Sequence, residues 1–243
     1  MKNFKTSLVS NLKALFWALL IAGVIRTFAI EPFKIPSGSM KPNLLVGDFL
    51  FVSKWNYGYS RYSFPFGLAP FSGKIFEKNP ERGDIIVFKL PGQENINYVK
   101  RLLGLPGETI KVMDGVVYIK KNNSEKFEKL NQIPDELFFD DQYQEEIMQL
   151  IEDNYKILNI TDNGPLDYTP EYKIPKNKYF FMGDNRDNSS DSRVMSGVGF
   201  VPKENMIGKV WFIWLSIDTQ FSLSKFWNLP LHIRYERLFK SVK

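Results

Sequence analysis

Two side chains, Ser39 and Lys100, could together form a nucleophile and its base. Ser39 lies in residues 35–41 (IPSGSMK). A serine hydroxyl is a poor nucleophile until a positioned base takes its proton. The chain has one histidine, His232 near its C-terminus, and no cysteine. This composition argues against a Ser-His-Asp triad and excludes a cysteine nucleophile and a disulfide. Lysine is the natural base that remains.

Lys100 lies in a segment that alternates like a β-strand, residues 96–103 (INYVKRLL). This alternation places Lys100 on one face with Tyr98 and Leu102. A free lysine has a pKa of about 10.4, so it must lose contact with water before it can act as a base near neutral pH. Apolar neighbours would provide that environment. The alternative is that Lys100 and Arg101 both reach solvent from the edge of a sheet.

Ser37 and Gly38 precede the candidate nucleophile. A glycine lets the backbone approach a substrate closely. The Ser39 amide and the Ser37 hydroxyl could donate two hydrogen bonds to the oxyanion of an acyl-transfer transition state. The alternative is an ordinary Ser-Gly linker that follows an apolar segment.

Short polar side chains crowd residues 183–193 (GDNRDNSSDSR). Asp187, Ser189 and Asp191 have the spacing of the first ligands of a calcium loop. However, Ser192 stands where that loop needs glycine, and Val198 stands where it needs glutamate. The pattern is better suited to a rigid turn, or to orienting another side chain.

Residues 14–30 form an apolar stretch with one charge, Arg26. As a helix it would be about 25 Å long, which is enough to cross the apolar part of a bilayer. Lys2, Lys5 and Lys13 precede it, which favours a cytoplasmic N-terminus. The exit lacks the small residues of a signal-peptide cleavage site, which favours an uncleaved anchor. A removed signal peptide and a buried soluble helix are the alternatives.

Beyond the apolar stretch, β-strands dominate the expectation. Pro32 is expected to end the helix. Asp114-Gly115 suits the turn of a hairpin over residues 109–121. The other segments with strand-like composition are residues 44–54, 85–89, 96–103, 179–182 and 210–217. Residues 142–153 are expected to form a short helix that exposes its carboxylates.

Charge and aromatic residues are unevenly distributed. Residues 135–153 carry eight carboxylates and no basic side chain, whereas both ends of the chain are basic. The ends could lie against anionic lipid headgroups. No nucleic-acid-reading motif accompanies these charges, so nucleic acid is not an expected partner. The aromatic residues 55–71 form either a hairpin folded on the core or a belt at the lipid interface.

Taken together, these segments resemble the bacterial type I signal peptidase family, a family of membrane-bound enzymes. The resemblance covers most of the chain and follows the family's motif order. Its segments are residues 31–33 (EPF), 36–40 (PSGSM), 45–48 (LVGD), 82–88 (RGDIIVF), 98–107 (YVKRLLGLPG) and 183–193.

The resemblance implies a Ser-Lys dyad. Ser39 would form the acyl-enzyme and Lys100 would be the general base. The Ser37 hydroxyl would join the Ser39 amide in the oxyanion hole. Ser189 would orient Lys100, with Asp191 and Arg193 supporting the site as an ion pair. The family's eukaryotic relatives have histidine at the position of Lys100, which points to the bacterial branch. Neither a metal nor a cofactor is implied.

The family's fold implies a mainly β architecture, an antiparallel catalytic body with an inserted second domain, preceded by one transmembrane helix. The expected division has five parts. These are residues 1–31 (cytoplasmic tip and anchor), 32–108 (first part of the catalytic domain), 109–175 (inserted domain), 176–220 (second part of the catalytic domain) and 221–243 (basic tail).

The function that the resemblance implies is removal of N-terminal signal peptides from exported preproteins by a membrane-bound serine endopeptidase. Its partners would be signal peptides and membrane lipid. It would sit in the bacterial inner membrane with one pass, its N-terminus cytoplasmic and its catalytic domain on the periplasmic or outer side. Phe33, Ile35 and Ile85 are candidates for the specificity pockets. The rival functions are a tethered, non-catalytic β-module that binds exported proteins, and a Ser-Lys peptidase devoted to one substrate.

Overall fold

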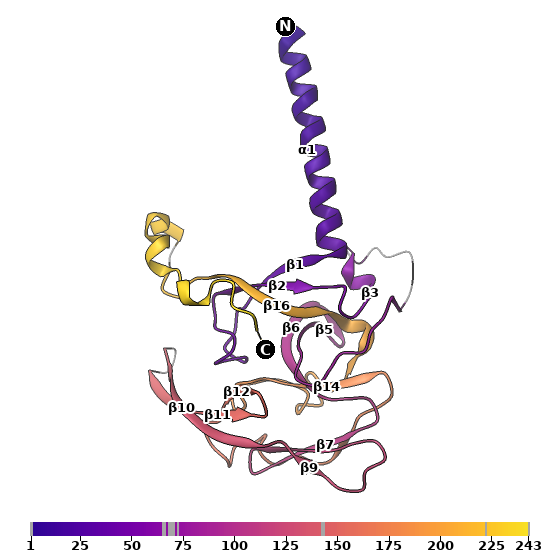
Figure 1. Ribbon diagram of the computed structural model, residues 1–243, viewed down its shortest axis with the longest axis vertical. Helices are drawn as coiled ribbons and strands as arrows, with labels where there is room; N and C mark the ends of the chain where they lie inside the picture. Colours follow the sequence, from indigo (N-terminus) through magenta and orange to yellow (C-terminus); the bar gives the residue numbers. More distant parts are fainter. Residues whose placement is uncertain are drawn as a thin grey trace.

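The computed structural model describes residues 2–64, 67, 71, 73–141, 144–221 and 223–242. One long helix, α1 (Lys2–Phe28), stands away from a body made of β-strands (Figure 1). The paired strands of the named sheets are antiparallel. The expected fold class, a mainly β antiparallel body behind one N-terminal apolar helix, is therefore confirmed.

Within α1, the 20 residues Val9–Phe28 are long and apolar enough to cross a membrane, with a mean hydropathy of 1.5. Apart from Thr27 near its end, no side chain of this span is buried. At 1.5 Å per residue this span is about 30 Å long. The prediction that Pro32 ends the helix is wrong. The helix ends at Phe28, and Pro32 lies in β1 (Ile30–Lys34) opposite Phe51. Proline is tolerated there because β1 is an edge strand.

The largest sheet has seven strands in the order β1-β2-β16-β5-β6-β14-β15. It draws strands from both ends of the chain, so residues far apart in sequence share one surface. Besides β1, its strands are β2 (Asp48–Ser53), β5 (Ile85–Leu90), β6 (Gln93–Gly104), β14 (Lys178–Met182), β15 (Val201–Pro202) and β16 (Met206–Ser216).

Two further sheets lie at the end of the body opposite α1 (Figure 1). The first has the order β13-β7-β8-β9, and the second has the order β10-β11-β12. Their strands are β7 (Thr109–Met113), β8 (Val116–Lys120), β9 (Glu128–Lys129), β13 (Tyr172–Lys173), β10 (Gln132–Asp140), β11 (Glu145–Glu152) and β12 (Tyr155–Leu158). The short helical segments are η1 (Arg61–Ser63), η3 (Lys203–Asn205), η4 (Leu223–His232) and η5 (Tyr235–Arg237).

The hairpin predicted around Asp114-Gly115 is confirmed. Strands β7 and β8 pair in continuous register from Met113 and Val116 outward. Asp114 has a φ of 51° and Gly115 a φ of 70°. Two successive positive φ angles are what a two-residue type I′ turn requires.

The helix predicted for residues 142–153 is wrong. Residues 142 and 143 lie outside the described part, and Glu145–Glu152 is the strand β11. Ile147 and Gln149 are buried while Met148 is exposed, which is the alternation of a strand. Pairing with β10 on one side and β12 on the other provides the hydrogen bonds. Tertiary pairing therefore overrides the local composition.

The strand predicted for residues 44–54 is shorter than expected, since β2 begins only at Asp48. Residues 44–47 form a turn in which Gly47 has a φ of 92°. A β-carbon at Gly47 would collide with the Ile217 carbonyl oxygen. This close approach and the positive φ require glycine at the entrance to β2.

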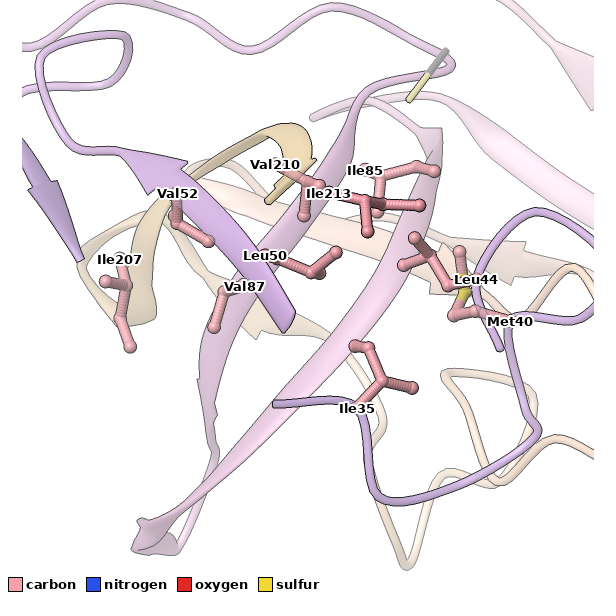
Figure 2. Packing of buried hydrophobic residues seen from close by; sticks show 10 residues of the cluster. All are labelled: Ile35, Met40, Leu44, Leu50, Val52, Ile85, Val87, Ile207, Val210 and Ile213. Atoms are coloured by element: carbon pink, nitrogen blue, oxygen red, sulfur yellow. The ribbon is translucent and has the colours of Figure 1, made fainter. Parts of the chain in front are cut away.

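One cluster of buried hydrophobic residues fills the space between the large sheet and the segment that carries Ser39 (Figure 2). Ile35, Met40 and Leu44 come from that segment, and they pack against side chains of three strands. The strand residues are Leu50 and Val52 of β2, Ile85 and Val87 of β5, and Ile207, Val210 and Ile213 of β16.

The described part of the aromatic stretch, residues 55–71, folds back toward the C-terminal end of α1. It includes β3 (Tyr59–Ser60), which pairs with β4 (Lys74–Ile75), just after the stretch, in a two-stranded sheet. The ring of Phe28 contacts the rings of Tyr59 and Phe64. Phe66, which belongs to the predicted aromatic belt, lies outside the described residues.

Candidate active site

The turn that carries Ser39 is held on both sides of the nucleophile. Ile35 and Met40 are buried in the core on either side of it. From the opposite direction, the backbone N–H of Asn185 donates to the Ser39 carbonyl oxygen at 3.1 Å, and its side-chain amide donates to the Gly38 carbonyl at 3.2 Å. The candidate nucleophile Ser39 is therefore held by the core on one side and by the loop after β14 on the other.

Lys100 and Ser39 meet although 61 positions separate them in the sequence, and a hydrogen bond joins Lys100 Nζ to Ser39 Oγ. Lys100 lies in β6, where it pairs with Ile86 of β5, and it is 3% exposed. Burial lowers the pKa of Lys100 to about 8, although the carboxylates of Asp191 and Asp184 oppose this shift. An amine with such a pKa is partly neutral near pH 7 and can accept a proton.

Gly183 allows the loop after β14 to approach the nucleophile. A β-carbon at this position would lie 2.5 Å from the Ser39 carbonyl oxygen and would also collide with the Ser189 side chain. Such a contact is far shorter than van der Waals distance. The sequence therefore places a glycine where both Ser39 and Ser189 pack against the backbone of the loop.

Asp191 and Arg193 form a buried ion pair behind the dyad. Arg193 Nε and Nη2 donate to the two carboxylate oxygens of Asp191, each at 2.9 Å, and the Gly183 N–H donates to the same carboxylate at 3.0 Å. Burial raises the pKa of Asp191, but the charge and hydrogen bonds of Arg193, with smaller contributions from Gly183 and Ser189, give a net decrease. Asp191 is therefore a fixed negative charge near Lys100.

The buried Ser189 hydroxyl makes no well-aligned hydrogen bond to any residue in the described part of the chain. The hydrogen bond to Lys100 that the family resemblance implies is thus not formed here. Ser189 nevertheless lies beside Gly183, next to the turn that carries Ser39.

Ser39 and Lys100 open into a groove of about 1410 Å³. Ser37, Phe33 and Ile35 line the same groove, so these expected residues gather around the dyad. Ile85 is not among the described residues that line this groove; it lines a separate cavity of about 620 Å³ and belongs to the buried core cluster. A groove of this size can hold several residues of an extended peptide.

Comparisons with known proteins show the family of this chain. A family model described as "Signal peptidase, peptidase S26" matches residues 8–215. The chain belongs to the peptidase S26 signal peptidase family. As a member of this family it is a serine endopeptidase.

Relatives in this family cover most of the chain. Signal peptidase I of Rickettsia felis is 43% identical, over 82% of this chain and 77% of that protein. Signal peptidase I of Rickettsia akari is 37% identical, over 99% of this chain and 94% of that protein. A crystal structure of a signal peptidase I from Enterococcus faecalis matches with a TM-score of 0.34 and 29% identity, covering 54% of this chain and 97% of that one.

In this family member, sequence reasoning missed a buried network on the other face of β6. Arg101 donates two hydrogen bonds of 2.7 Å to the Asp184 carboxylate, and its guanidinium lies 3.8 Å from the centre of the Tyr155 ring. Asn43 also donates to Asp184, at 2.7 Å. Arg101 was expected to share a strand with Lys100, but nothing local indicated that its partners come from the Gly183 loop and from β12.

Two further buried ion pairs connect β10 and β11 to the catalytic side. Lys41 Nζ lies 2.7 and 2.8 Å from the Asp140 carboxylate oxygens. Arg186 forms a two-pronged pair with Glu152, with one distance of 2.6 Å. The sequence held one sign of these ion pairs, namely that residues 135–153 have no basic side chain. Any carboxylate that is buried there needs a cation from elsewhere in the chain.

Proposed function

We propose that this peptidase removes N-terminal signal peptides from exported preproteins, with Ser39 as nucleophile and Lys100 as general base. The observation that carries the proposal is the hydrogen bond between a buried lysine amine and a serine hydroxyl at an open groove. The relatives named signal peptidase I support the choice of substrate. The lowered pKa of Lys100 supports its role as the base.

In the proposed mechanism, the neutral Lys100 amine takes the Ser39 hydroxyl proton while Ser39 Oγ attacks the carbonyl carbon of the scissile peptide bond. The tetrahedral intermediate collapses, the C–N bond breaks, and Lys100 gives the proton to the leaving amine. The signal peptide is then esterified to Ser39. Lys100 next takes a proton from water, whose hydroxide attacks the ester, and the proton returns to Ser39 Oγ as the signal peptide leaves.

The remaining roles belong to the same proposal. The Ser39 amide and the Ser37 hydroxyl would donate to the oxyanion, and Ser189 would orient Lys100 during proton transfer. Asp191 and Arg193 would hold the Gly183 loop in place. The five-part division at residues 31, 108, 175 and 220 is also proposed. It is supported by the large sheet, which draws its strands from either side of residues 109–175.

For location, we place α1 across a bacterial inner membrane as a single uncleaved anchor. The length and hydropathy of Val9–Phe28 support this placement. Lys2, Lys5 and Lys13 favour a cytoplasmic N-terminus, which puts the β-strand body on the periplasmic or outer side. The exposed rings of Trp55 and Trp211 would lie toward lipid.

The experiment that tests this function uses several unrelated preproteins. Each is incubated with the full-length enzyme in detergent micelles, and the new N-terminus of the product is sequenced. We expect cleavage of all of them at the end of the signal peptide. Binding without cleavage would favour a non-catalytic module, and cleavage of only one preprotein would favour a specialised peptidase. Either result would overturn the general function.

The pKa of Lys100 predicts the pH dependence of cleavage. Because the neutral amine is the base, kcat/KM should rise about tenfold per pH unit below about pH 8 and level off above it. If the base were a lysine with its ordinary pKa, kcat/KM would still be rising above pH 9. The profile is measured with one preprotein from pH 6 to 10. A plateau that is already complete at pH 6 would contradict the assignment of Lys100.

A further inference from the structure

The groove that holds Ser39 and Lys100 is lined by residues from two separate regions of the body. Arg26 and Glu31 lie next to the C-terminal end of α1. Phe138, Phe139 and Asp141 come from the hairpin of β10 and β11. Ser39 and Lys100 line the same continuous groove. A peptide that crosses the dyad would therefore touch β1 on one side of the cut and the hairpin on the other.

The position of α1 assigns a direction to such a peptide. Helix α1 leads into strand β1 in the upper part of the body, while β10 and β11 lie below the large sheet, on the side away from the helix (Figure 1). Under the proposed function, the apolar segment of a signal peptide comes from the same bilayer as α1. The residues before the cut then reach Ser39 from the side of β1, and the residues after the cut continue toward the hairpin.

The β10–β11 hairpin is fixed by buried contacts to the turn that carries Ser39. Asp140, at the end of β10, is fully buried and forms the ion pair with Lys41, two residues after Ser39. The Lys41 side chain lies against Gly38, within about 3.0 Å of where a β-carbon would stand. Asn43 donates to the Lys156 carbonyl of β12 at 2.6 Å. The groove wall is thus held in place before substrate arrives.

The chemistry of this wall is aromatic and acidic. Phe139 is 51% exposed, and Asp141 is also exposed. Lys41, Lys156 and Arg186 neutralise three of the hairpin's carboxylates. The exposed carboxylates that remain include Glu136, Asp141, Glu145 and Glu146, and residues 132–153 carry no lysine or arginine, so the exposed charge of the hairpin is negative. We propose that the β10–β11 hairpin binds the first residues of the mature chain, those after the cut, and that it favours basic and apolar side chains there over acidic ones. This inference rests on the proposed function.

The test uses one preprotein in three forms that differ only at the second to fourth residues after the cut, which are all Ala, all Lys or all Glu. The full-length enzyme is assayed in neutral detergent micelles, so that no lipid charge contributes. We expect kcat/KM to be about tenfold higher for the Lys form than for the Glu form at low salt, with a smaller ratio at 0.5 M salt. Equal rates for the three forms would overturn the proposal.

Asp141 is tested against a matched control on the same hairpin. Asp141→Asn should lower the Lys-to-Glu ratio by about threefold, since one partly exposed charge pair is removed. Glu136→Gln removes the same charge from strand β10 of the same hairpin, and Glu136 is exposed but is not among the described residues that line the groove. It should leave the ratio within a factor of about 1.5. Equal effects of the two substitutions would contradict the proposal that Asp141 acts locally on the peptide in the groove.

Phe139 has its own control in Leu137, which shares its face of β10 and is 57% exposed but is not among the described groove residues. For a preprotein with Leu at the second residue after the cut, Phe139→Ala should raise KM about fivefold while kcat changes little. Leu137→Ala should change neither. No change in KM for Phe139→Ala would overturn the proposal. If the wild type fails to cut even the Ala form, the proposed function itself fails.

Discussion

Replacing Ser39 with Ala, or Lys100 with Met, is expected to lower preprotein cleavage by a thousandfold or more, to about the background rate. Under the proposed mechanism, Ser39→Ala removes the atom that would bond to the substrate. Lys100→Met keeps the length and apolar character of the side chain but removes the amine that takes the proton. Because the two residues act as one unit, the double variant should be no slower than either single variant. Single-turnover cleavage of one preprotein provides the measurement.

Lys74 offers a control for Lys100. Burial lowers the pKa of Lys74 to about 8, the same value as for Lys100, but Lys74 donates to the Tyr57 carbonyl at 3.2 Å and lies away from Ser39. Lys74→Met should leave cleavage essentially unchanged. A Lys100→Met variant that folds normally and still cleaves would show that another group is the base. The comparison separates the effect of a lowered pKa from that of contact with the nucleophile.

The largest effect on stability is expected at Glu152. Its carboxylate is fully buried, and besides Arg186 it accepts hydrogen bonds from the Tyr155 hydroxyl at 2.6 Å and the Gln132 amide at 2.8 Å. Glu152→Gln leaves the buried guanidinium of Arg186 without its counter-charge. Breaking such a pair costs about 3–5 kcal/mol. In a domain of this size, the melting temperature should fall by about 10 °C, as measured by thermal unfolding of the full chain in micelles.

A double variant and the pH dependence check the cause of that loss. Glu152→Leu combined with Arg186→Met removes both charges and should recover most of the melting temperature. Burial raises the pKa of Glu152, but Arg186 outweighs this effect and gives a net decrease. The stability contributed by Glu152 is therefore present above the carboxyl's ordinary pKa and is lost as the pH falls through its lowered value. A loss that stays constant from pH 7 to pH 3 would contradict this account.

The sequence predicted those elements that depend on interactions between neighbouring residues, and it failed where an element depends on residues far away in the chain. The β7–β8 hairpin depends on the backbone freedom of two adjacent residues, Asp114 and Gly115, which is visible locally. Strand β11 depends on its pairing with β10 and β12. Its composition favoured a helix, and the pairing overrides that local preference. Residues with strand periodicity were therefore recognised only where their own composition favours β structure.

The candidate site divides in the same way. The residue types of Ser39 and Lys100 indicated a dyad, because the chain offers no other conventional base for a serine. In contrast, the Arg101–Asp184 pair joins residues 83 positions apart, and the Lys41–Asp140 pair joins residues 99 apart. Neither partner carries a local signature, since lysine, arginine and aspartate are usually exposed. Only the folded chain shows that these charges are buried together.

The joint between helix and body consists of a single residue. Helix α1 ends at Phe28, β1 begins at Ile30, and the intervening Ala29 accepts a hydrogen bond of 3.0 Å from the Lys54 amide. The Tyr59 hydroxyl donates to the Phe28 carbonyl at 2.8 Å. A junction this short, held by hydrogen bonds, restricts rotation of α1 relative to the body. The distance between the end of α1 and the candidate site is therefore set by the fold.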